Sequence, residues 1–251
     1  MVSKYRLAVS VIFLSILTFL LMRLDLGAVF EQMARAKKQY LVVAGVVFFS
    51  MLYLKIKKFV WISSYYSHVM YFKQATLVQM VGIALATLTP GRIGEGSKVI
   101  LMKKYLKIPV SSSFSIIVLE RILDVAVLSA GAFLLSFYII KDMMVITGFF
   151  FLVLVMFLYL FLKQQDRFVG LVPEKYRGYL AVERKSNSPL FIIIALATVS
   201  IWGLEAVFQW LLLRSFDTSL SIFAVFGIMS ISTIMVFFSV LPAGIGTVDA
   251  S

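Results

Sequence analysis

The chain has 251 residues, of which 61% are hydrophobic, well above the roughly 45–50% that is typical of soluble domains. Its net charge of +12 comes from 24 basic and 12 acidic residues, and most of the basic ones lie between long apolar runs. This distribution indicates orientation in a membrane and attraction to anionic headgroups rather than nucleic-acid binding. The absence of cysteine excludes disulfides, iron–sulfur clusters and thiolate zinc sites.

The apolar runs predict an all-α, polytopic membrane helix bundle of about six to eight membrane segments in one integral domain, residues 1–251. The first crossing is predicted at Tyr5–Met22 and the second at Tyr40–Trp61. Between them, Leu24–Lys38 has apolar residues at helical spacing and a basic end, which predicts a short helix in the membrane interface. The second crossing ends in three lysines, Lys55, Lys57 and Lys58, which we expect to reach the surface or to pair inside the bundle.

Ala75–Leu88 is an apolar segment of only about 14 residues, and Thr89-Pro90-Gly91 follows it directly. At about 1.5 Å per residue this segment is too short to cross a bilayer comfortably, so we expect a re-entrant half-helix. Gly91 and Gly94 permit a sharp change of backbone direction. A helix is then predicted to resume over Ile93–Tyr105.

The second part of the chain alternates apolar segments with polar connections. Three serines, Ser111 to Ser113, are predicted to cap a crossing that ends near Ile140. The remaining predicted elements are a crossing at Met143–Leu162, a basic cytoplasmic loop over 163–188, a crossing at Pro189–Leu213, and a segment Ser221–Leu241 that leads into a second break.

The second break, Val240–Asp249, repeats the pattern of the first. In both, a proline is followed at +3 and +4 by Ile-Gly: Pro90, Ile93 and Gly94, then Pro242, Ile245 and Gly246. Counting the crossings places the two breaks on segments that enter from opposite faces, as an inverted-topology repeat requires. Interrupted segments at corresponding positions of two halves indicate the binding site of a transporter.

Charged residues gather around the first break and in the crossing that follows it. The candidate substrate-binding residues are Arg92, Glu95, Lys98, Glu120, Arg121, Asp124, Gly91, Gly94, Gly244, Gly246, Asp249 and Glu205. The three cations and three carboxylates nearest the break cancel, so mutual pairing is expected if they lie deep. Two interpretations stay open. The network only locks the broken segment to the next crossing, or one of its cations holds a lipid phosphate.

Residue patterns typical of catalysis, metal binding or cofactor binding are missing from the sequence. The single histidine, His68, has a tyrosine-rich setting and is expected at the interface rather than on a metal. We therefore expect a transporter and no enzyme, without metal or cofactor. Two alternatives are an integral-membrane transferase with Glu120 or Asp124 as base, and a non-catalytic partner of a glycosyltransferase.

Taken in order, Thr89-Pro90-Gly91-Arg92-Ile93-Gly94-Glu95, then Glu120-Arg121-x-x-Asp124, then Leu241-Pro242-Ala243-Gly244-Ile245-Gly246 resemble the lysylphosphatidylglycerol synthase transmembrane-region family. Its members are multi-pass proteins of prokaryotic plasma membranes, similar to the flippase half of the multiple peptide resistance factor. The resemblance implies movement between leaflets of an anionic or aminoacylated phospholipid or of a polyprenyl-linked lipid. An envelope-biosynthesis enzyme is an implied partner. The sequence shows no aminoacyl-transferase domain, and family members continue beyond its last residue, Ser251, so a truncated chain is expected.

Overall fold

The computed structural model describes residues 26–138 and 188–238, with residues 145, 148–149, 151–153 and 155–156 between them. All regular structure in these ranges is helical, which confirms the all-α prediction. The predicted first crossing, the loop 163–187 and the second break lie outside the described residues, and only short pieces of the crossing at Met143–Leu162 lie within them.

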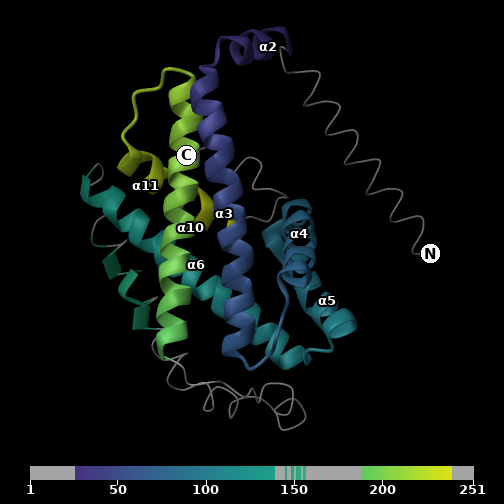
Figure 1. The fold of residues 1–251 in the computed structure, drawn as a ribbon. Coiled ribbons are helices and arrows are strands. Elements are labelled where there is room, and N and C mark those ends of the chain that lie inside the picture. Colours follow the sequence, from purple (N-terminus) through teal and green to yellow (C-terminus); the bar gives the residue numbers. More distant parts are fainter. Residues whose placement is uncertain are drawn as a thin grey trace, which may run out of the picture.

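Two long helices form the axis of the described bundle: α3, Lys38–Tyr65, and α10, Ser188–Ser215, each of 28 residues. They lie side by side and run in opposite directions (Figure 1). Aromatic contacts join them, with ring centroids 5.7 Å apart for Phe48 and Phe208 and 6.1 Å for Tyr65 and Phe191. Both are long and apolar enough to cross a membrane, since 28 residues of helix extend about 42 Å. The predicted crossings are therefore confirmed as helices, slightly longer at both ends.

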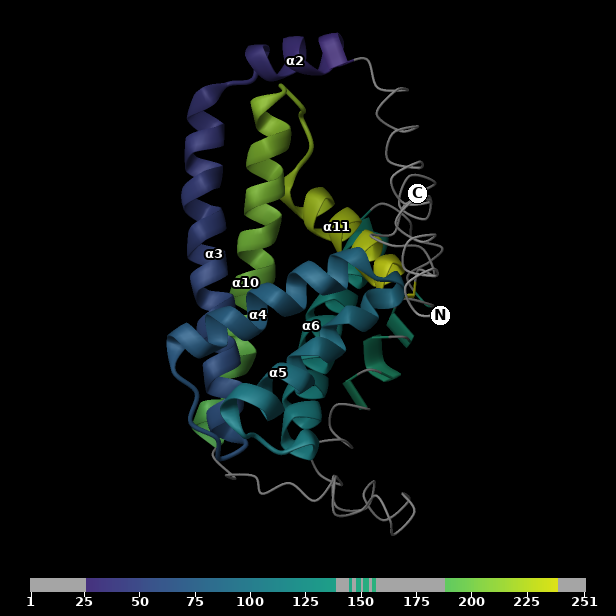
Figure 2. The same ribbon diagram turned by 90° about the vertical axis from the view of Figure 1, so that its right-hand side faces the viewer.

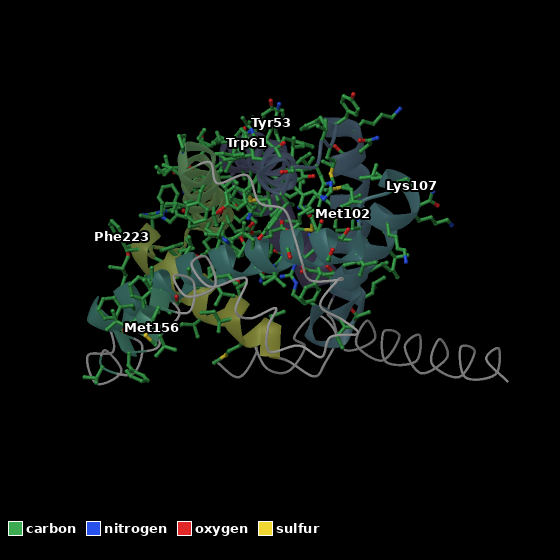
Figure 3. All side chains as sticks on the ribbon, turned by 90° about the horizontal axis from the view of Figure 1, so that it is seen from below. Tyr53, Trp61, Met102, Lys107, Met156 and Phe223 are labelled. Atoms are coloured by element: carbon green, nitrogen blue, oxygen red, sulfur yellow. The ribbon has the colours of Figure 1, made fainter. Side chains whose placement is uncertain are left out.

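The outer faces of the bundle are apolar. Large hydrophobic side chains such as Phe49, Tyr53 and Phe223 are more than half exposed, whereas Met102 is completely buried. Figure 3 shows Tyr53 and Phe223 at the periphery and Met102 in the interior. Contact with lipid explains an exterior of this kind, because soluble proteins rarely expose apolar patches so extensive.

Helix α2, Leu26–Arg35, crosses the end of the bundle at a steep angle to α3 (Figures 1 and 2). It exposes Phe30 and Met33, as the predicted interfacial helix should. Beyond α2, the Lys37 side chain forms an ion pair with Asp217, and its backbone N–H donates to the Ser215 carbonyl at 3.0 Å. These contacts fasten the start of α3 to the end of α10.

The predicted break separates α4, Phe72–Leu88, from α5, Ser97–Leu106, with a short 3₁₀ helix, η1, Pro90–Gly96, between them. In Figure 2 the chain turns back at η1, so that α5 lies beside α4. The Thr89 hydroxyl donates to the Leu85 carbonyl at 2.8 Å and accepts from the Gly94 N–H at 2.7 Å. A side-chain carbon at Gly94 would lie 2.2 Å from the Leu85 oxygen, so only glycine fits there.

One local prediction in this region was wrong. The α-helix resumes at Ser97 rather than at the predicted Ile93, because the residues between them form the tighter 3₁₀ turn. Within this turn Arg92 has a left-handed backbone conformation, with φ of 56°.

Helix α6, Val110–Tyr138, is the crossing that carries Glu120, Arg121 and Asp124. It begins one residue before Ser111, so the three serines lie inside its first turn and are buried there. Their predicted role as caps that precede the helix is therefore wrong. The Ser113 N–H instead donates to the Pro109 carbonyl at 2.9 Å and continues the helical pattern.

Helix α11, Ile222–Phe238, belongs to the second half of the predicted repeat. The last residues of α3 and α10 lie 150 residues apart, as do the first residues of α4 and α11. The connections match in detail, since Ser67 and Asp217 both have φ of 62°. The hydrogen bond from the His68 N–H to the Ser63 carbonyl, 3.0 Å, has its equivalent between Thr218 and Leu213, 3.2 Å. Because α3 and α10 are antiparallel, α4 and α11 start from opposite ends of the bundle, as the predicted inverted repeat requires.

Candidate functional site

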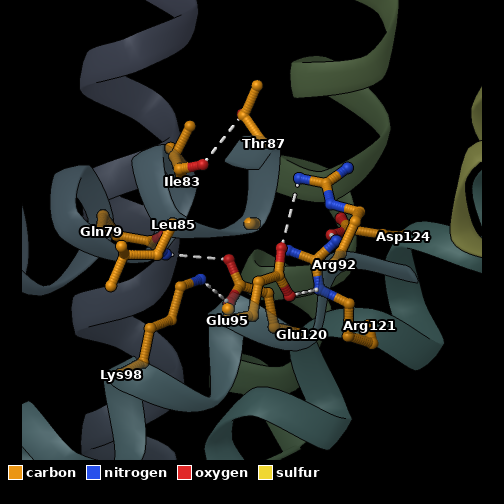
Figure 4. Close-up of polar contacts among 12 residues, drawn as sticks. Gln79, Ile83, Leu85, Thr87, Arg92, Glu95, Lys98, Glu120, Arg121 and Asp124 are labelled. Carbon is orange, nitrogen blue, oxygen red and sulfur yellow. Dashed lines mark hydrogen bonds and ion pairs between the residues drawn. The ribbon is translucent and has the colours of Figure 1, made fainter. Parts of the chain in front are cut away.

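The candidate site lies where the broken hairpin α4–η1–α5 meets α6 and the two long helices (Figure 4). Its polar side chains come from every one of these elements and are Lys58 of α3, Gln79 of α4, Arg92 and Glu95 of η1, Lys98 of α5, Glu120, Arg121 and Asp124 of α6, and Trp202 of α10. They form three connected groups that differ in how far they are open to the surroundings.

The first group centres on the Glu120 carboxylate. The Lys98 ammonium donates to its Oε2 at 3.0 Å and the Gln79 amide donates to its Oε1 at 2.9 Å. All three residues are essentially fully buried. Gly82 of α4 makes room for the lysine, because a side-chain carbon there would lie 2.5 Å from Lys98 Cε. The Lys98 ammonium also lies 5.3 Å from the centre of the Phe59 ring. This group joins α4, α5 and α6 and leaves no exposed surface for a ligand.

The second group centres on Asp124, whose Oδ1 accepts two hydrogen bonds. The Lys58 ammonium donates at 2.7 Å and the Trp202 indole donates at 3.1 Å. Lys58 is completely buried and Asp124 nearly so. The group links α6 to both long helices. Breaking such a pair by removing one partner typically costs about 3–5 kcal/mol, because a buried charge is left without compensation.

The third group consists of Glu95 between two arginines. Arg121 Nε lies 2.9 Å from Glu95 Oε2, and Arg92 Nη2 lies 3.2 Å from Glu95 Oε1. Arg121 also lies 3.5 Å from Asp124 Oδ2, so it connects this group to the second one. Both arginine side chains are 25% exposed, whereas Glu95 is 8% exposed. This is the part of the network that a ligand can reach.

The six charges predicted to pair are joined in the structure by a seventh. Within the described residues, the network contains four cations, Lys58, Arg92, Lys98 and Arg121, and three carboxylates, Glu95, Glu120 and Asp124. The additional cation is Lys58, which lies on the preceding crossing and reaches Asp124 across 66 residues of sequence. Pairing inside the bundle, one of the two alternatives for the three lysines of α3, is correct for Lys58.

Glu205 lies on α10, near the helix contact between α3 and α10. Its carboxylate attracts the ammonium of Lys55, a residue that Asp124 attracts as well. Lys55 and Glu205 occupy equivalent positions in the two halves of the repeat, 150 residues apart. Among the described residues, no ion pair joins Glu205 to the network.

The structure brings together most of the predicted site residues. Gly91 and Gly94 belong to η1 beside them, while Gly244, Gly246 and Asp249 lie outside the described residues. The sequence analysis missed Lys58 as a site residue, and with it Gln79 and Trp202. Lys58 and Gln79 could have been found from the sequence, since a lysine and a glutamine within apolar membrane helices need polar partners. Nothing in the sequence identifies Trp202, whose role depends on the packing of α10 against α6.

No curated protein and no solved structure matches this chain significantly. The model of one protein family, described as the lysylphosphatidylglycerol synthase TM region, matches residues 5–251. The match spans the broken hairpin, the charged network and both halves of the repeat. The protein therefore belongs to the lysylphosphatidylglycerol synthase TM-region family, a family of membrane proteins in lipid metabolism.

Proposed function

We propose that this protein binds the phosphate of an anionic membrane lipid at Arg92 and Arg121 and helps to move that lipid between the leaflets. The observation that carries the proposal is the exposure of these two guanidinium groups, 25% each, at the edge of a buried ionic network. The remaining charges of the network are buried among their partners.

Arginine suits this role because its planar guanidinium group can donate two parallel hydrogen bonds to a phosphate. Glu95 lies between the two arginines and contacts both within 3.2 Å, which holds their side chains at a fixed separation. The η1 segment adds backbone groups outside regular α-helix, and such a segment survives at membrane depth only within protein or beside a wet cavity. A lipid headgroup that enters beside η1 would meet both arginines.

The inverted repeat supports transport rather than simple binding. Helices α4 and α11 start from opposite ends of the bundle and follow equivalent long helices. Folds of this kind expose a central site to one face or the other by movement of one half against the other. We place the protein in a prokaryotic plasma membrane as a multi-pass protein, as the family resemblance implies.

We propose no catalytic step. The two carboxylates considered as bases, Glu120 and Asp124, are buried and accept hydrogen bonds from buried ammonium groups at 3.0 Å and 2.7 Å. A general base needs access to the proton that it removes. Neither carboxylate has that access in this arrangement, so no observation favours the transferase alternative.

The proposal is tested by reconstituting the full chain in vesicles that contain a fluorescent phosphatidylglycerol and following dithionite access to the outer leaflet. We expect Arg92→Gln and Arg121→Gln each to slow lipid movement at least about tenfold, because each removes charge-assisted hydrogen bonds to phosphate. Lys103→Gln is the matched control, since it removes an exposed cation of α5 outside the network. Equal rates for all four proteins, or a wild-type rate no faster than empty vesicles, would refute the proposal.

A further inference from the structure

We infer that Thr89 is the positioning residue of the site, because its hydroxyl and carbonyl groups hold η1 in the conformation that brings Arg92 and Glu95 together beside α6. The inference rests on the proposed function and names the residue that sets the geometry of the same site. It follows from the hydrogen bonds that Thr89 forms and from the backbone conformation of Arg92.

The first step is the backbone of Thr89 itself, which Pro90 determines. The proline ring clashes with a helical conformation of the residue before it and favours an extended one. Thr89 accordingly has φ of −121° and ψ of 141°, and α4 ends at Leu88. The branched side chain of threonine also has few rotamers. The Thr89 hydroxyl is therefore held at the junction between α4 and η1.

The second step is that Thr89 binds η1 at two points. Its hydroxyl donates to the Leu85 carbonyl at 2.8 Å and accepts from the Gly94 N–H at 2.7 Å. Its carbonyl accepts from the Arg92 N–H at 3.3 Å. One residue thus fastens both the start and the middle of η1 to the last turn of α4.

The third step concerns Arg92, whose backbone conformation needs support from its surroundings. Its φ of 56° lies in the left-handed region, which residues with a side chain rarely adopt and which persists where neighbouring contacts enforce it. Thr89 holds the N–H of Arg92 and the N–H two residues later. These bonds favour the conformation in which the Arg92 guanidinium lies 3.2 Å from Glu95 Oε1.

The fourth step links Thr89 to α6 through Gly94. A side-chain carbon at Gly94 would lie 2.7 Å from the Thr89 hydroxyl oxygen, so glycine permits the close approach of the two residues. Glu95 follows directly and lies 2.9 Å from Arg121 of α6. A shift of Gly94 away from Thr89 would therefore also move Glu95 relative to Arg121.

The test compares Thr89→Val, which keeps the shape of the side chain and removes the hydroxyl, with Thr89→Ser, which keeps the hydroxyl. In the vesicle assay with fluorescent phosphatidylglycerol, we expect the valine variant to move lipid about fivefold more slowly and the serine variant to stay within about twofold of wild type. Thr87→Val is the matched control, because the Thr87 hydroxyl donates to the Ile83 carbonyl of its own helix at 3.0 Å (Figure 4).

A distance measurement separates positioning from a contribution to stability alone. The sequence contains no cysteine, so spin labels on Ile93→Cys and Phe114→Cys report the distance between η1 and α6 by double electron–electron resonance. Both side chains are more than half exposed. We expect Thr89→Val to shift or broaden this distance distribution, and Thr89→Ser and Thr87→Val to leave it unchanged. A reference pair, Val46→Cys with Phe114→Cys, joins α3 to α6 and should keep its distance in every variant.

The outcomes are distinguishable. Slower lipid movement together with a displaced η1, both restored by serine, supports the inference. A valine variant with the wild-type distance or the wild-type rate overturns it, as does an equal effect of Thr87→Val. If Thr89→Val does not fold, as judged by gel filtration, Thr89→Ala gives the same comparison. Absence of lipid movement by the wild type overturns the proposed function, and the distances then still decide whether Thr89 positions η1.

Discussion

The two halves of the described bundle have almost the same backbone and very different chemistry. Helices α3 and α4 contribute Lys58 and Gln79 to a buried ionic network, whereas α10 and α11 carry phenylalanine and methionine at the equivalent positions. The connections that follow α3 and α10 match down to a φ of 62° at one residue in each. The comparison shows that similar connections can carry different side chains, and that, within the described residues, the buried ionic network takes its lysine and its glutamine from α3 and α4 and not from the equivalent positions of α10 and α11.

The largest expected effect comes from removing the charge of Lys58, whose equivalent in the second half, Phe208, is uncharged. Lys58→Met leaves the buried Asp124 carboxylate without its closest cation, which should destabilise the protein by about 3–5 kcal/mol. Phe208→Met at the equivalent position of α10 is the control, and we expect it to cost less than about 1.5 kcal/mol, as hydrophobic replacements of similar volume do. Thermal unfolding in detergent micelles measures both. Equal melting temperatures for the two variants would show that Lys58 contributes no more to stability than Phe208 does.

The turn of the first half should be the next most sensitive feature. Gly94→Ala places a carbon 2.2 Å from the Leu85 carbonyl oxygen, so the backbone of η1 has to shift. Overpacking of this kind costs about 1–3 kcal/mol. The shift would also move Glu95 and both arginines, so lipid binding should weaken together with stability.

Gly96→Ala is a matched control in the same turn, because a side-chain carbon at Gly96 meets no atom within 4 Å. Its φ of −57° suits alanine, so we expect unchanged or slightly increased stability. A similar loss of stability for the two glycine variants would mean that flexibility of the segment matters, rather than the close approach at Gly94.

Gln79→Met, which copies Met229 of the second half, should have a somewhat smaller effect. The variant removes the amide that donates to Glu120 Oε1 at 2.9 Å and leaves that buried oxygen without this donor. The expected cost is about 1–3 kcal/mol, measured by thermal unfolding. The reverse change, Met229→Gln, introduces an amide without a charged partner in α11 and should destabilise as well. If Gln79→Met leaves the stability unchanged, the Lys98 ammonium alone satisfies the Glu120 carboxylate.

The smallest expected effect is a pH dependence of the protein's stability, caused by His68 in the connection between α3 and α4. Burial lowers the pKa of the His68 imidazole below its ordinary value of 6.5, because desolvation disfavours the cation. The unfolded chain then binds a proton more readily, so His68 contributes stability above pH 6.5 that is lost as the pH falls through the lower folded pKa.

His68→Thr copies Thr218 of the second connection and should remove this dependence. Between pH 7 and pH 5, the free energy of unfolding of the wild type should fall by less than about 1 kcal/mol more than that of the variant, because the imidazole is partly accessible to water. Melting curves of both proteins across that range would measure it. A variant that loses as much stability as wild type on acidification would exclude a contribution from His68.

The long helices and the position of the broken segment could be predicted from the sequence, because apolar length and the proline-glycine pattern depend on neighbouring residues. Six of the charged site residues could be grouped for the same reason, since they lie within two short segments of the chain: Arg92, Glu95 and Lys98, and Glu120, Arg121 and Asp124. Lys58 and Trp202 could not be assigned to Asp124, because these contacts span 66 and 78 residues and depend on how α3 and α10 pack against α6. The sequence predicted the inverted repeat from its two breaks, whereas the matching of the two connections became visible only in the structure, because those segments share backbone geometry rather than residue types.

The separation of Lys58 from Asp124 also has a consequence for biogenesis. At about 5–20 residues per second, the ribosome needs roughly 3–13 s to make the 66 residues between them. During that interval α3 would have to enter the bilayer with an unpaired ammonium group, which costs about 2.5–3.5 kcal/mol at the centre of a crossing. We expect α3 to stay beside the insertion machinery, with Lys58 near water, until α6 arrives and the two helices move into lipid as a pair.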